Sequence, residues 1–436
     1  METLHAYLER KHEELDLLSS FLRKPPPGMH PHSIAEVIEK KFRLAAALKA
    51  EQLQCDWAFT ETSWSNPEVH QVGPFHFRFH YQRADLEVDG PPIYPFGESA
   101  PAPRIYTSSG MAAIAALFSA ISRFWPDAEL WMPAASYGET CEFVDNYLAR
   151  FHVVTADCVP EVPRSSARMR MFLLDSSAPG GALESLLACD RPELDLLVFD
   201  TTCLSTGSRR IRRVVNWTRA RAIPAILVRS HTKLDSLGLE YGRLGSMAFV
   251  GADDARIRSV QLPHFADEAR KSVRLFGNAA VPAHFPPFVG SDLYRRLCNR
   301  RFAAILRNGR IARTRFSCGS MGPQAVEFLA NGLCISLAPD RDWDERKTTR
   351  MATDLCAELS GAGFPMQHAG SFGFDFGAMD AYLDPARRRW VIRISIPDLP
   401  SLLWDRITRA IGQWWFVHRS ERNAPLLRLA ANARGG

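Results

Sequence analysis

The feature that most constrains the fold of this chain is an alternation of short apolar segments with helical patterns between residues 104 and 230. Helices are predicted at 111–124, near 141–151 and around Val214 to Trp217, where apolar residues recur at helical spacing. The apolar segments predict strands at 129–132, 153–154, 171–174, 196–199 and 225–228. Such strands, separated by helices, are typical of a mostly parallel sheet covered on both faces, so we predict an α/β fold. Ligands bind these sheets beyond the carboxyl ends of the strands.

The flanking segments lead us to expect three domains, at residues 1–103, 104–287 and 288–436. Residues 2–24 predict a helix with an apolar stripe of Leu4, Leu8, Leu15, Leu18 and Leu22. A second helix should begin at the capping box of Ser33 and Glu36, with an apolar face of Ile34, Val37, Ile38, Phe42, Leu44 and Leu48. Residues 57–103 are rich in aromatic residues, histidine and proline, and the alternation at 75–81 predicts a strand within a long arm. From residue 288 helical patterns prevail, with a strand at 390–396 and a helix at 403–415, which indicates a smaller α+β domain.

Composition excludes several classes of protein. With 46% hydrophobic and 23% charged residues the chain is globular, and a net charge of +5 is too weak a bias to indicate a nucleic-acid or membrane partner. No apolar stretch approaches the ~20 residues that span a bilayer. Residues 1–24 lack the pattern of a signal peptide, so we expect a cytoplasmic protein. The nine cysteines have no C-x-x-C pair and no paired Cys/His spacing, which favours buried thiols over disulfides or a metal site.

Three polar clusters follow predicted strands or begin predicted helices. Ser109 and Gly110 directly precede a helix, where free N–H groups favour a phosphate, although the same pattern fits a plain N-cap. Asp200 ends an apolar strand, where a buried carboxylate needs a cation or several donors, or caps the next turn. Ser230-His231-Thr232-Lys233 follows the next strand, and a lysine delivered into a cleft is a candidate for Schiff-base chemistry.

Together with three further segments, these clusters resemble the motifs of the fold-type I pyridoxal-phosphate enzymes, and within them the cystathionine synthase and lyase group. The resemblance extends from about Tyr106 to Trp415. The similar segments, in chain order, are Ser109-Gly110-Met111-Ala112-Ala113, Ser136-Tyr137-Gly138-Glu139-Thr140, Asp200-Thr201-Thr202, Ser230-His231-Thr232-Lys233, Gly370-Ser371-Phe372-Gly373 and Arg393-Ile394-Ser395. Six segments in the right order are more specific than any one of them.

The resemblance implies the fold-type I architecture, pyridoxal 5'-phosphate as cofactor, and a role for each similar residue. Lys233 would hold the cofactor as a Schiff base and then move protons, and Asp200 would keep the ring nitrogen protonated. Tyr137 would stack on the pyridine ring, and Arg393 with Ser371 would bind the carboxylate of the substrate. The other implied cofactor-binding residues are Ser109, Gly110, Met111, Thr202, Ser230 and Thr232.

The chain departs from the family pattern at two places. The family's Ser-x-Asn-Pro segment corresponds to residues 175–180, which contain no asparagine, so we expect Ser177 or Thr202 to substitute. The family's Tyr-x-Arg, which reaches the phosphate of the neighbouring subunit, is matched only weakly by Tyr81-Gln82-Arg83. The resemblance nevertheless implies a homodimer or homotetramer, with the arm at 75–83 against the neighbour's cofactor site.

The resemblance favours γ-elimination or γ-replacement on a small L-amino acid, in sulfur metabolism or in a specialised biosynthesis. Aminotransferases and β-lyases use the same lysine and aspartate, so the residues leave those reactions open. Ser230-x-x-Lys233 also matches the nucleophile pattern of penicillin-recognising serine hydrolases, but the companion motifs S-D-N and K-T-G are missing. A third alternative is a binding module that has lost catalysis, against which the presence of both Asp200 and Lys233 argues.

Overall fold

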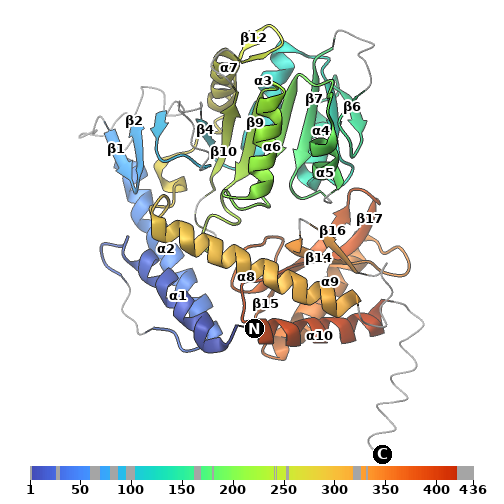
Figure 1. Ribbon diagram of the computed structural model, residues 1–436. Coiled ribbons are helices and arrows are strands. Elements are labelled where there is room, and N and C mark those ends of the chain that lie inside the picture. Colours follow the sequence, from blue (N-terminus) through green and yellow to red (C-terminus); the bar gives the residue numbers. More distant parts are fainter. Residues whose placement is uncertain are drawn as a thin grey trace, which may run out of the picture. The chain divides into compact units, whose positions relative to one another are not determined.

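The computed structural model describes residues 2–25, 30–58, 69–78, 87–94, 104–161, 168–178, 181–239, 241, 243–251, 255–317, 326–329 and 332–419 (Figure 1). The chain divides into two compact units. The small unit comprises Met1–Leu15, Gly28–Lys41 and Asn299–Gly436, and the large unit comprises Asp16–Pro27 and Phe42–Cys298. This division differs from three consecutive domains, because helices α1 (Leu4–Ser19) and α2 (Ile34–Ala58) each contribute residues to both units.

A seven-stranded sheet with the order β4-β10-β9-β8-β7-β5-β6 forms the centre of the large unit. Strand β10 is antiparallel to both of its neighbours, β4 and β9, and the other pairs are parallel. The remaining six strands therefore all point the same way, and the predicted α/β class is confirmed. The strands are β4 (Arg104–Thr107), β5 (Glu129–Met132), β6 (His152–Thr155), β7 (Arg170–Asp175), β8 (Leu196–Asp200), β9 (Ala225–Ser230) and β10 (Gly245–Val250).

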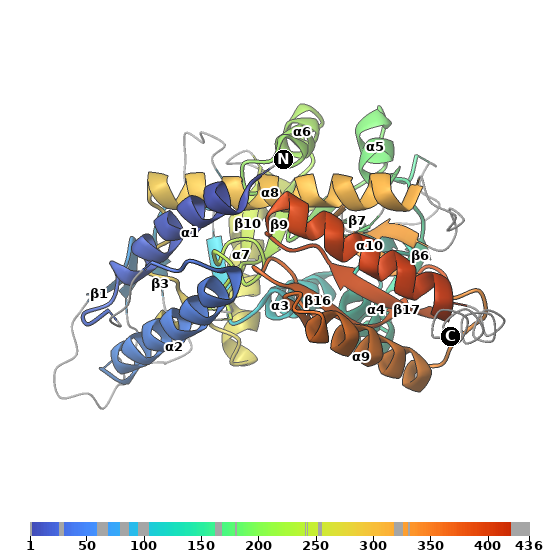
Figure 2. The ribbon, with the colours of Figure 1, turned by 90° about the horizontal axis from the view of Figure 1, so that it is seen from below.

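Helices cover both faces of this sheet, as Figure 2 shows. On one face lie α3 (Gly110–Phe124), α4 (Gly138–Tyr147) and α7 (Leu262–Leu275), and on the other lie α5 (Gly181–Ala188) and α6 (Arg209–Ala220). Side chains of each strand alternate between the two cores: Leu196 and Val198 of β8 face α3, whereas Leu197 and Phe199 face α6. The strands are therefore apolar on both sides, which is why they appear as continuous apolar runs in the sequence.

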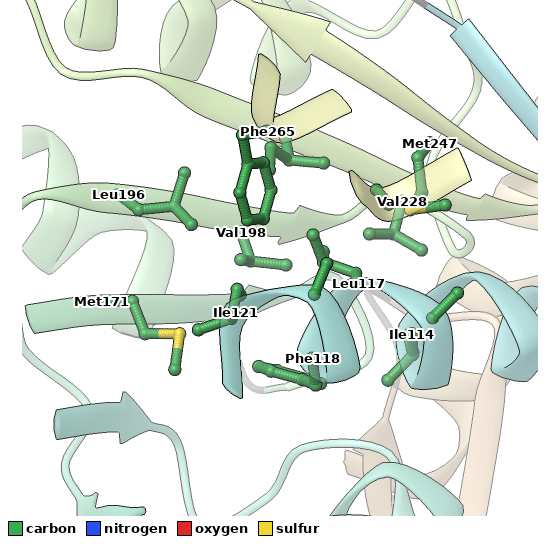
Figure 3. Packing of buried hydrophobic residues seen from close by; sticks show 14 of the residues in the cluster. Ile114, Leu117, Phe118, Ile121, Met171, Leu196, Val198, Val228, Met247 and Phe265 are labelled. Carbon is green, nitrogen blue, oxygen red and sulfur yellow. The ribbon is translucent and has the colours of Figure 1, made fainter. Parts of the chain in front are cut away.

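The core on the α3 side forms because α3 is rich in alanine and larger apolar residues at helical spacing. Each large apolar side chain of α3 that is fully buried stabilises the folded state by about 1.5–3 kcal/mol relative to an exposed side chain. Figure 3 shows Ile114, Leu117, Phe118 and Ile121 of this helix packed near Met171, Leu196, Val198, Val228 and Met247 of the sheet and Phe265 of α7. This packing fixes the helix against the sheet, and with it the position of the first turn of α3.

The aromatic arm contributes a second sheet to the large unit, with β1 (Val69–Val72), β2 (Phe75–Arg78) and β3 (Glu87–Asp89) in that order. The rings of Phe75 and Phe77 are buried against Phe285, at centroid distances of 4.8 and 4.9 Å. The predicted strand is confirmed as far as Arg78, and residues 79–83, with the Tyr81-Gln82-Arg83 match, lie outside the described residues. The large unit also contains β11 (Arg256–Ile257), β12 (Val260–Gln261) and the short 3₁₀ helix η1 (Pro282–His284).

The small unit is built on a five-stranded sheet with the order β13-β14-β17-β16-β15. Helix α9 (Glu345–Gly361) packs on it, and α10 (Ser401–His418) packs on α9. The predicted strand at 390–396 and helix at 403–415 are confirmed within a few residues. The strands are β13 (Val326–Leu329), β14 (Cys334–Leu337), β15 (Met366–His368), β16 (Gly377–Asp384) and β17 (Arg389–Ser395), and α8 (Asp292–Ser317) contributes its later part.

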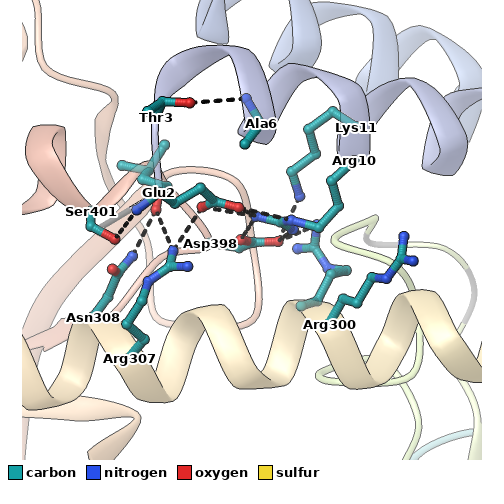
Figure 4. Close-up of polar contacts among 12 residues, drawn as sticks. Glu2, Thr3, Ala6, Arg10, Lys11, Arg300, Arg307, Asn308, Asp398 and Ser401 are labelled. Carbon is teal, nitrogen blue, oxygen red and sulfur yellow. Dashed lines mark hydrogen bonds and ion pairs between the residues drawn. The ribbon is translucent and has the colours of Figure 1, made fainter.

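A cluster of buried charges lies within the small unit. The carboxylate of Asp398 accepts hydrogen bonds from Arg10, at 2.6 Å, and from Lys11, at 2.6 Å (Figure 4). Asp375 pairs with Lys41 at 2.7 Å and with Arg301 at 2.9 Å. We call this set, completed by Glu14, the buried ion cluster; its members are Arg10, Lys11, Glu14, Lys41, Arg301, Asp375 and Asp398.

The buried ion cluster overturns part of the apolar faces predicted for the first two helices. Leu4 was expected on the apolar stripe of α1 but is 47% exposed, whereas Leu15 and Leu18 are buried as predicted. The buried side of α1 also carries the charges of the buried ion cluster. On α2, Phe42 is 51% exposed while its neighbour Lys41 is buried. Burial of Lys41 is stabilised by carboxylates from other elements, which helical periodicity alone does not reveal.

Three further observations concern the described residues as a group. Seven of the described cysteines, from Cys141 to Cys356, have free thiols, and four of these are buried. No described helix is long and apolar enough to cross a membrane. Within the same residues, no group of three or more His, Cys, Asp or Glu side chains is arranged to hold a metal ion.

Candidate functional site

The residues predicted for the site in the large unit gather at one edge of the seven-stranded sheet, which we call the carboxyl edge. Asp200 and Ser230, which were predicted, and Asp175, which was not, end the adjacent parallel strands β8, β9 and β7. Strand alternation places all three side chains on the face covered by α3. The strand order reverses here, because the chain passes from β5 outward to β6 and then to β7 on the opposite side of β5. Ligands of open α/β sheets bind at such a switch point.

Ser108 and Ser109 form the turn between β4 and α3, and Gly110 is the first residue of the helix. The Ser109 hydroxyl accepts the N–H of Ala112 at 3.0 Å, so Ser109 caps the helix. A Cβ atom at Gly110 would lie 2.8 Å from the Cβ of Ser230, and one at Gly245 would lie 2.1 Å from the Ser109 carbonyl oxygen. The two glycines therefore allow the start of α3 to lie directly against β9 and β10. The N-cap is confirmed, and it is compatible with a phosphate at the N–H groups of the same turn.

A chain of hydrogen bonds joins Asp200 to the segment that contains Lys233. Asp200 Oδ1 accepts the N–H of Thr202 at 2.8 Å, and the Thr202 hydroxyl accepts the N–H of Ser230 at 3.0 Å. The Ser230 hydroxyl in turn lies 3.0 Å from that of Thr232, the residue before Lys233. Asp200 is buried, whereas the other four are half-buried. The structure thus brings together two motifs that the sequence separates by a whole helix.

Tyr137 begins α4 beside a carboxylate that sequence reasoning missed as a site residue. The Tyr137 N–H donates to Asp175 Oδ2 at 2.6 Å, and the Ser177 N–H donates to Asp175 Oδ1 at 2.6 Å. Met111 lies at the same junction, with its sulfur 3.8 Å from the hydroxyl of Thr140 on α4. The signal that could have identified Asp175 is the one used for Asp200, a carboxylate that ends a buried apolar strand.

Asp175 and Asp200 are register partners on neighbouring strands, and both are buried. Burial, and after it the charge of Asp175, raise the pKa of Asp200 to about 7, against the hydrogen bonds from Thr202 and the charge of Arg229. Burial also raises the pKa of Asp175, against the hydrogen bonds from Tyr137 and Ser177. Two adjacent buried carboxylates do not both ionise readily. A cationic or protonated group of a ligand would relieve this cost.

The segment containing Lys233 is closed by a second set of contacts that the sequence did not predict. Asp235 accepts two hydrogen bonds from the guanidinium of Arg229, at 2.6 and 2.7 Å, and lies 2.8 Å from Nδ1 of His231. Burial alone would raise the pKa of Asp235, but the Arg229 guanidinium lowers it well below the usual range. Lys233 therefore lies in a short loop whose two ends, His231 and Asp235, contact each other.

Neither Ser230 nor Ser246 has the setting of a hydrolytic nucleophile. Ser246 lies 2.8 Å from Nε2 of His231, which gives the order Ser246, His231, Asp235, but Ser246 is fully buried within β10. Ser230 ends a strand, whereas the nucleophile of the penicillin-recognising hydrolases begins a helix. The contacts of His231 instead tie the Lys233 loop to the sheet.

Within the small unit, the two late segments of the resemblance lie together. Arg393 on β17 donates to both carboxylate oxygens of Asp380 on β16, at 3.1 and 2.7 Å, and to the carbonyl of Gly370, next to Ser371, at 3.2 Å. The guanidinium carbon also lies 4.3 Å from the centre of the Tyr382 ring. Sequence reasoning missed Asp380. The planar donor expected to bind a substrate carboxylate is thus already bound to a carboxylate of the protein.

No family model matches the chain, and no curated protein matches it. The resemblance to pyridoxal-phosphate enzymes therefore depends on the six short segments and on the geometry of the carboxyl edge.

Proposed function

We propose that the chain is a pyridoxal-phosphate-dependent enzyme of fold type I that acts on a small L-amino acid. The observation that carries this proposal is the convergence of Ser109, Asp200 and Lys233 at the carboxyl edge. These residues come from three segments separated by helices, yet Gly110 lies against Ser230, and Thr202 joins Asp200 to the Lys233 segment. The same three segments are the ones that resemble the phosphate, ring-nitrogen and lysine motifs of the family.

The residue types at the carboxyl edge suit this cofactor. A buried carboxylate is stabilised by a protonated ring nitrogen beside it, and Asp200 is a carboxylate whose ionised form burial and the charge of Asp175 disfavour in the protein alone. A phosphate is bound by hydroxyl groups and by the N–H groups at the start of a helix, and Ser109, Ser230 and Thr232 supply the hydroxyls. The amine of Lys233 is the group that can attach the cofactor covalently.

When bound, the cofactor supplies an electron sink for negative charge at the α-carbon of the substrate. Asp200 would hold the proton of the ring nitrogen, and Tyr137 would cover the ring. Lys233 would take the α-proton and then act at the β-carbon, which leads to loss or replacement of a γ-substituent. Arg393 and Ser371 remain candidates for binding the substrate carboxylate, with Asp380 as the group that this carboxylate would replace.

The class of reaction is tested by incubating the protein and pyridoxal 5'-phosphate with candidate amino acids in deuterium oxide. We expect deuterium at both the α- and β-carbons and loss of a γ-substituent without an added keto acid, as followed by NMR and mass spectrometry. Exchange at the α-carbon alone, with turnover only when a keto acid is supplied, would instead identify an aminotransferase. The Lys233→Ala variant is the control for protein-independent exchange by the free cofactor.

A further inference from the structure

Asp175 occupies a place at the carboxyl edge that the proposed function does not use. It ends β7 directly opposite Asp200 in the register of the parallel pair, and the two side chains lie on the same face of the sheet. It is 5% exposed, and Asp200 is 8% exposed. The pair is therefore built into the sheet itself, where neither carboxylate can turn away to water.

Hydrogen bonds hold the Asp175 carboxylate from two sides. The Tyr137 N–H, at the start of α4, donates to one oxygen at 2.6 Å, and the Ser177 N–H donates to the other at 2.6 Å. The backbone contact of Tyr137 with Asp175 joins the start of α4 to the end of β7. The position of the tyrosine that would cover the ring thus depends on Asp175.

The guanidinium of Arg229, whose charge acts on Asp200, is bonded to other groups. The charges of Asp175 on β7 and of Arg229 on β9 act on Asp200, and the charge of Asp175 acts on the thiol of Cys141 on α4. The charge of Asp200 acts on the buried hydroxyl of Tyr94, and Lys233 lies in the loop that follows β9. Arg229 is bonded to another carboxylate and to two backbone carbonyls, and strand alternation places it on the opposite face of the sheet. Its charge is thus largely committed to those partners.

We propose that Asp175 is a second acidic residue of this site, which positions Tyr137 and forms with Asp200 a pair that shares one proton until a cationic ligand group binds. The identity of that group as a protonated ring nitrogen rests on the proposed function. The pair itself is a property of the protein alone. Adjacent carboxylates that share a site titrate in two separate steps, because the first charge opposes the second.

The charge relation is tested in the protein without cofactor, by a carbon-13 NMR titration of labelled aspartate carboxyl groups. The Asp200 signal is assigned by its loss in Asp200→Asn. In Asp175→Asn we expect the titration midpoint of Asp200 to fall by about 1 pH unit or more. In Asp175→Glu, which keeps the charge, the midpoint should stay near the wild-type value. The matched control is Asp195→Asn, because Asp195 directly precedes the opposite end of β8 and should leave the midpoint unchanged.

The positioning role is tested on the same samples by hydrogen exchange at the Tyr137 amide. Exchange should become at least several-fold faster in Asp175→Ala and stay unchanged in the Asp195→Asn control. The proposal is overturned if the Asp200 midpoint does not move in Asp175→Asn, or if Asp175→Ala leaves the Tyr137 amide protected. Neither measurement uses the cofactor, so a coupled pair in a protein that binds no pyridoxal phosphate would refute the proposed function and leave this inference standing.

Discussion

At the scale of single residues, the burial of Asp200 makes the stability of the folded protein depend on pH. Its pKa is raised to about 7 in the folded chain, above the ordinary value of about 3.9 in the unfolded chain. The folded state therefore binds more protons than the unfolded state between these values, and the contribution of Asp200 to stability falls as the pH rises through this range. A buried carboxylate at this place thus weakens the cofactor-free protein at neutral and higher pH.

Asp200→Asn should remove this penalty. We compare the unfolding free energy of the variant with that of wild type, both without cofactor. This difference should be about 2–4 kcal/mol more favourable to the variant at pH 8 than at pH 5. Urea unfolding monitored at both pH values measures the difference. A difference between variant and wild type that is the same at pH 5 and pH 8 would show that Asp200 is ionised in the folded chain throughout.

The residue types at strand ends allowed several candidate site residues at the carboxyl edge to be predicted. The hydrogen-bond and ion-pair partners of those residues could not be predicted. Asp200 and Lys233 could be identified because each follows an apolar run. Asp235 and Asp380 follow no such run, and each is defined by an arginine that the fold brings to it. A pairing of this kind depends on which strands become neighbours, which local sequence does not determine.

At the scale of elements, the turn between β4 and α3 depends on two glycines more than on its serines. Gly245→Ala would place a Cβ atom 2.1 Å from the Ser109 carbonyl oxygen and 2.7 Å from the Gly110 nitrogen, both backbone atoms that cannot move aside easily. We expect a loss of about 1–3 kcal/mol in unfolding free energy and weaker binding of pyridoxal phosphate, as measured by urea unfolding and absorbance titration.

Gly207→Ala is the matched control for this prediction. It lies in the turn before α6, and a Cβ atom there would meet no atom within 4 Å. Its unfolding free energy should stay within about 0.5 kcal/mol of wild type. Equal effects of the two substitutions would mean that close packing at the start of α3 is unimportant.

Helices α3, α4 and α6 and strands β5 to β9 were predictable because their apolar runs and helical periods are regular. Elements β4, α5, α7 and β10 were not predicted, and β10 is antiparallel to both of its neighbours. The direction of a strand leaves no trace in its composition. Helical spacing predicted that Phe42 is buried and did not identify Lys41 as a buried residue. The reason is that the carboxylate partners of Lys41 come from α1 and from residue 375.

At the scale of the whole molecule, the buried ion cluster joins parts of the small unit that are far apart in sequence. Glu14 on α1 contacts Lys11, Lys41 and Arg301. Burial alone would raise the pKa of Glu14, but these cations lower it below the usual value. Its contribution to stability is therefore present above the unfolded pKa of about 4.3 and is lost as the pH falls through the lower folded value.

Glu14→Gln should destabilise the full chain by about 3–5 kcal/mol at neutral pH, because it leaves buried cations without their partner. The neighbouring Glu13 pairs with Arg300, and both side chains are about half exposed. Glu13→Gln should therefore change the unfolding free energy by no more than about 1 kcal/mol. Urea unfolding of both variants decides the matter, and similar losses would mean that the cluster contributes no more than an exposed ion pair.

The central claim is that Lys233 at the carboxyl edge holds pyridoxal phosphate, and it is tested most directly by locating the covalent adduct. The purified protein is mixed with the cofactor, reduced with borohydride, digested and analysed by mass spectrometry. We predict a single modified lysine, Lys233, and no stoichiometric adduct in Lys233→Ala. An adduct on an exposed lysine such as Lys271 on α7, or equal labelling of wild type and Lys233→Ala, would contradict the account.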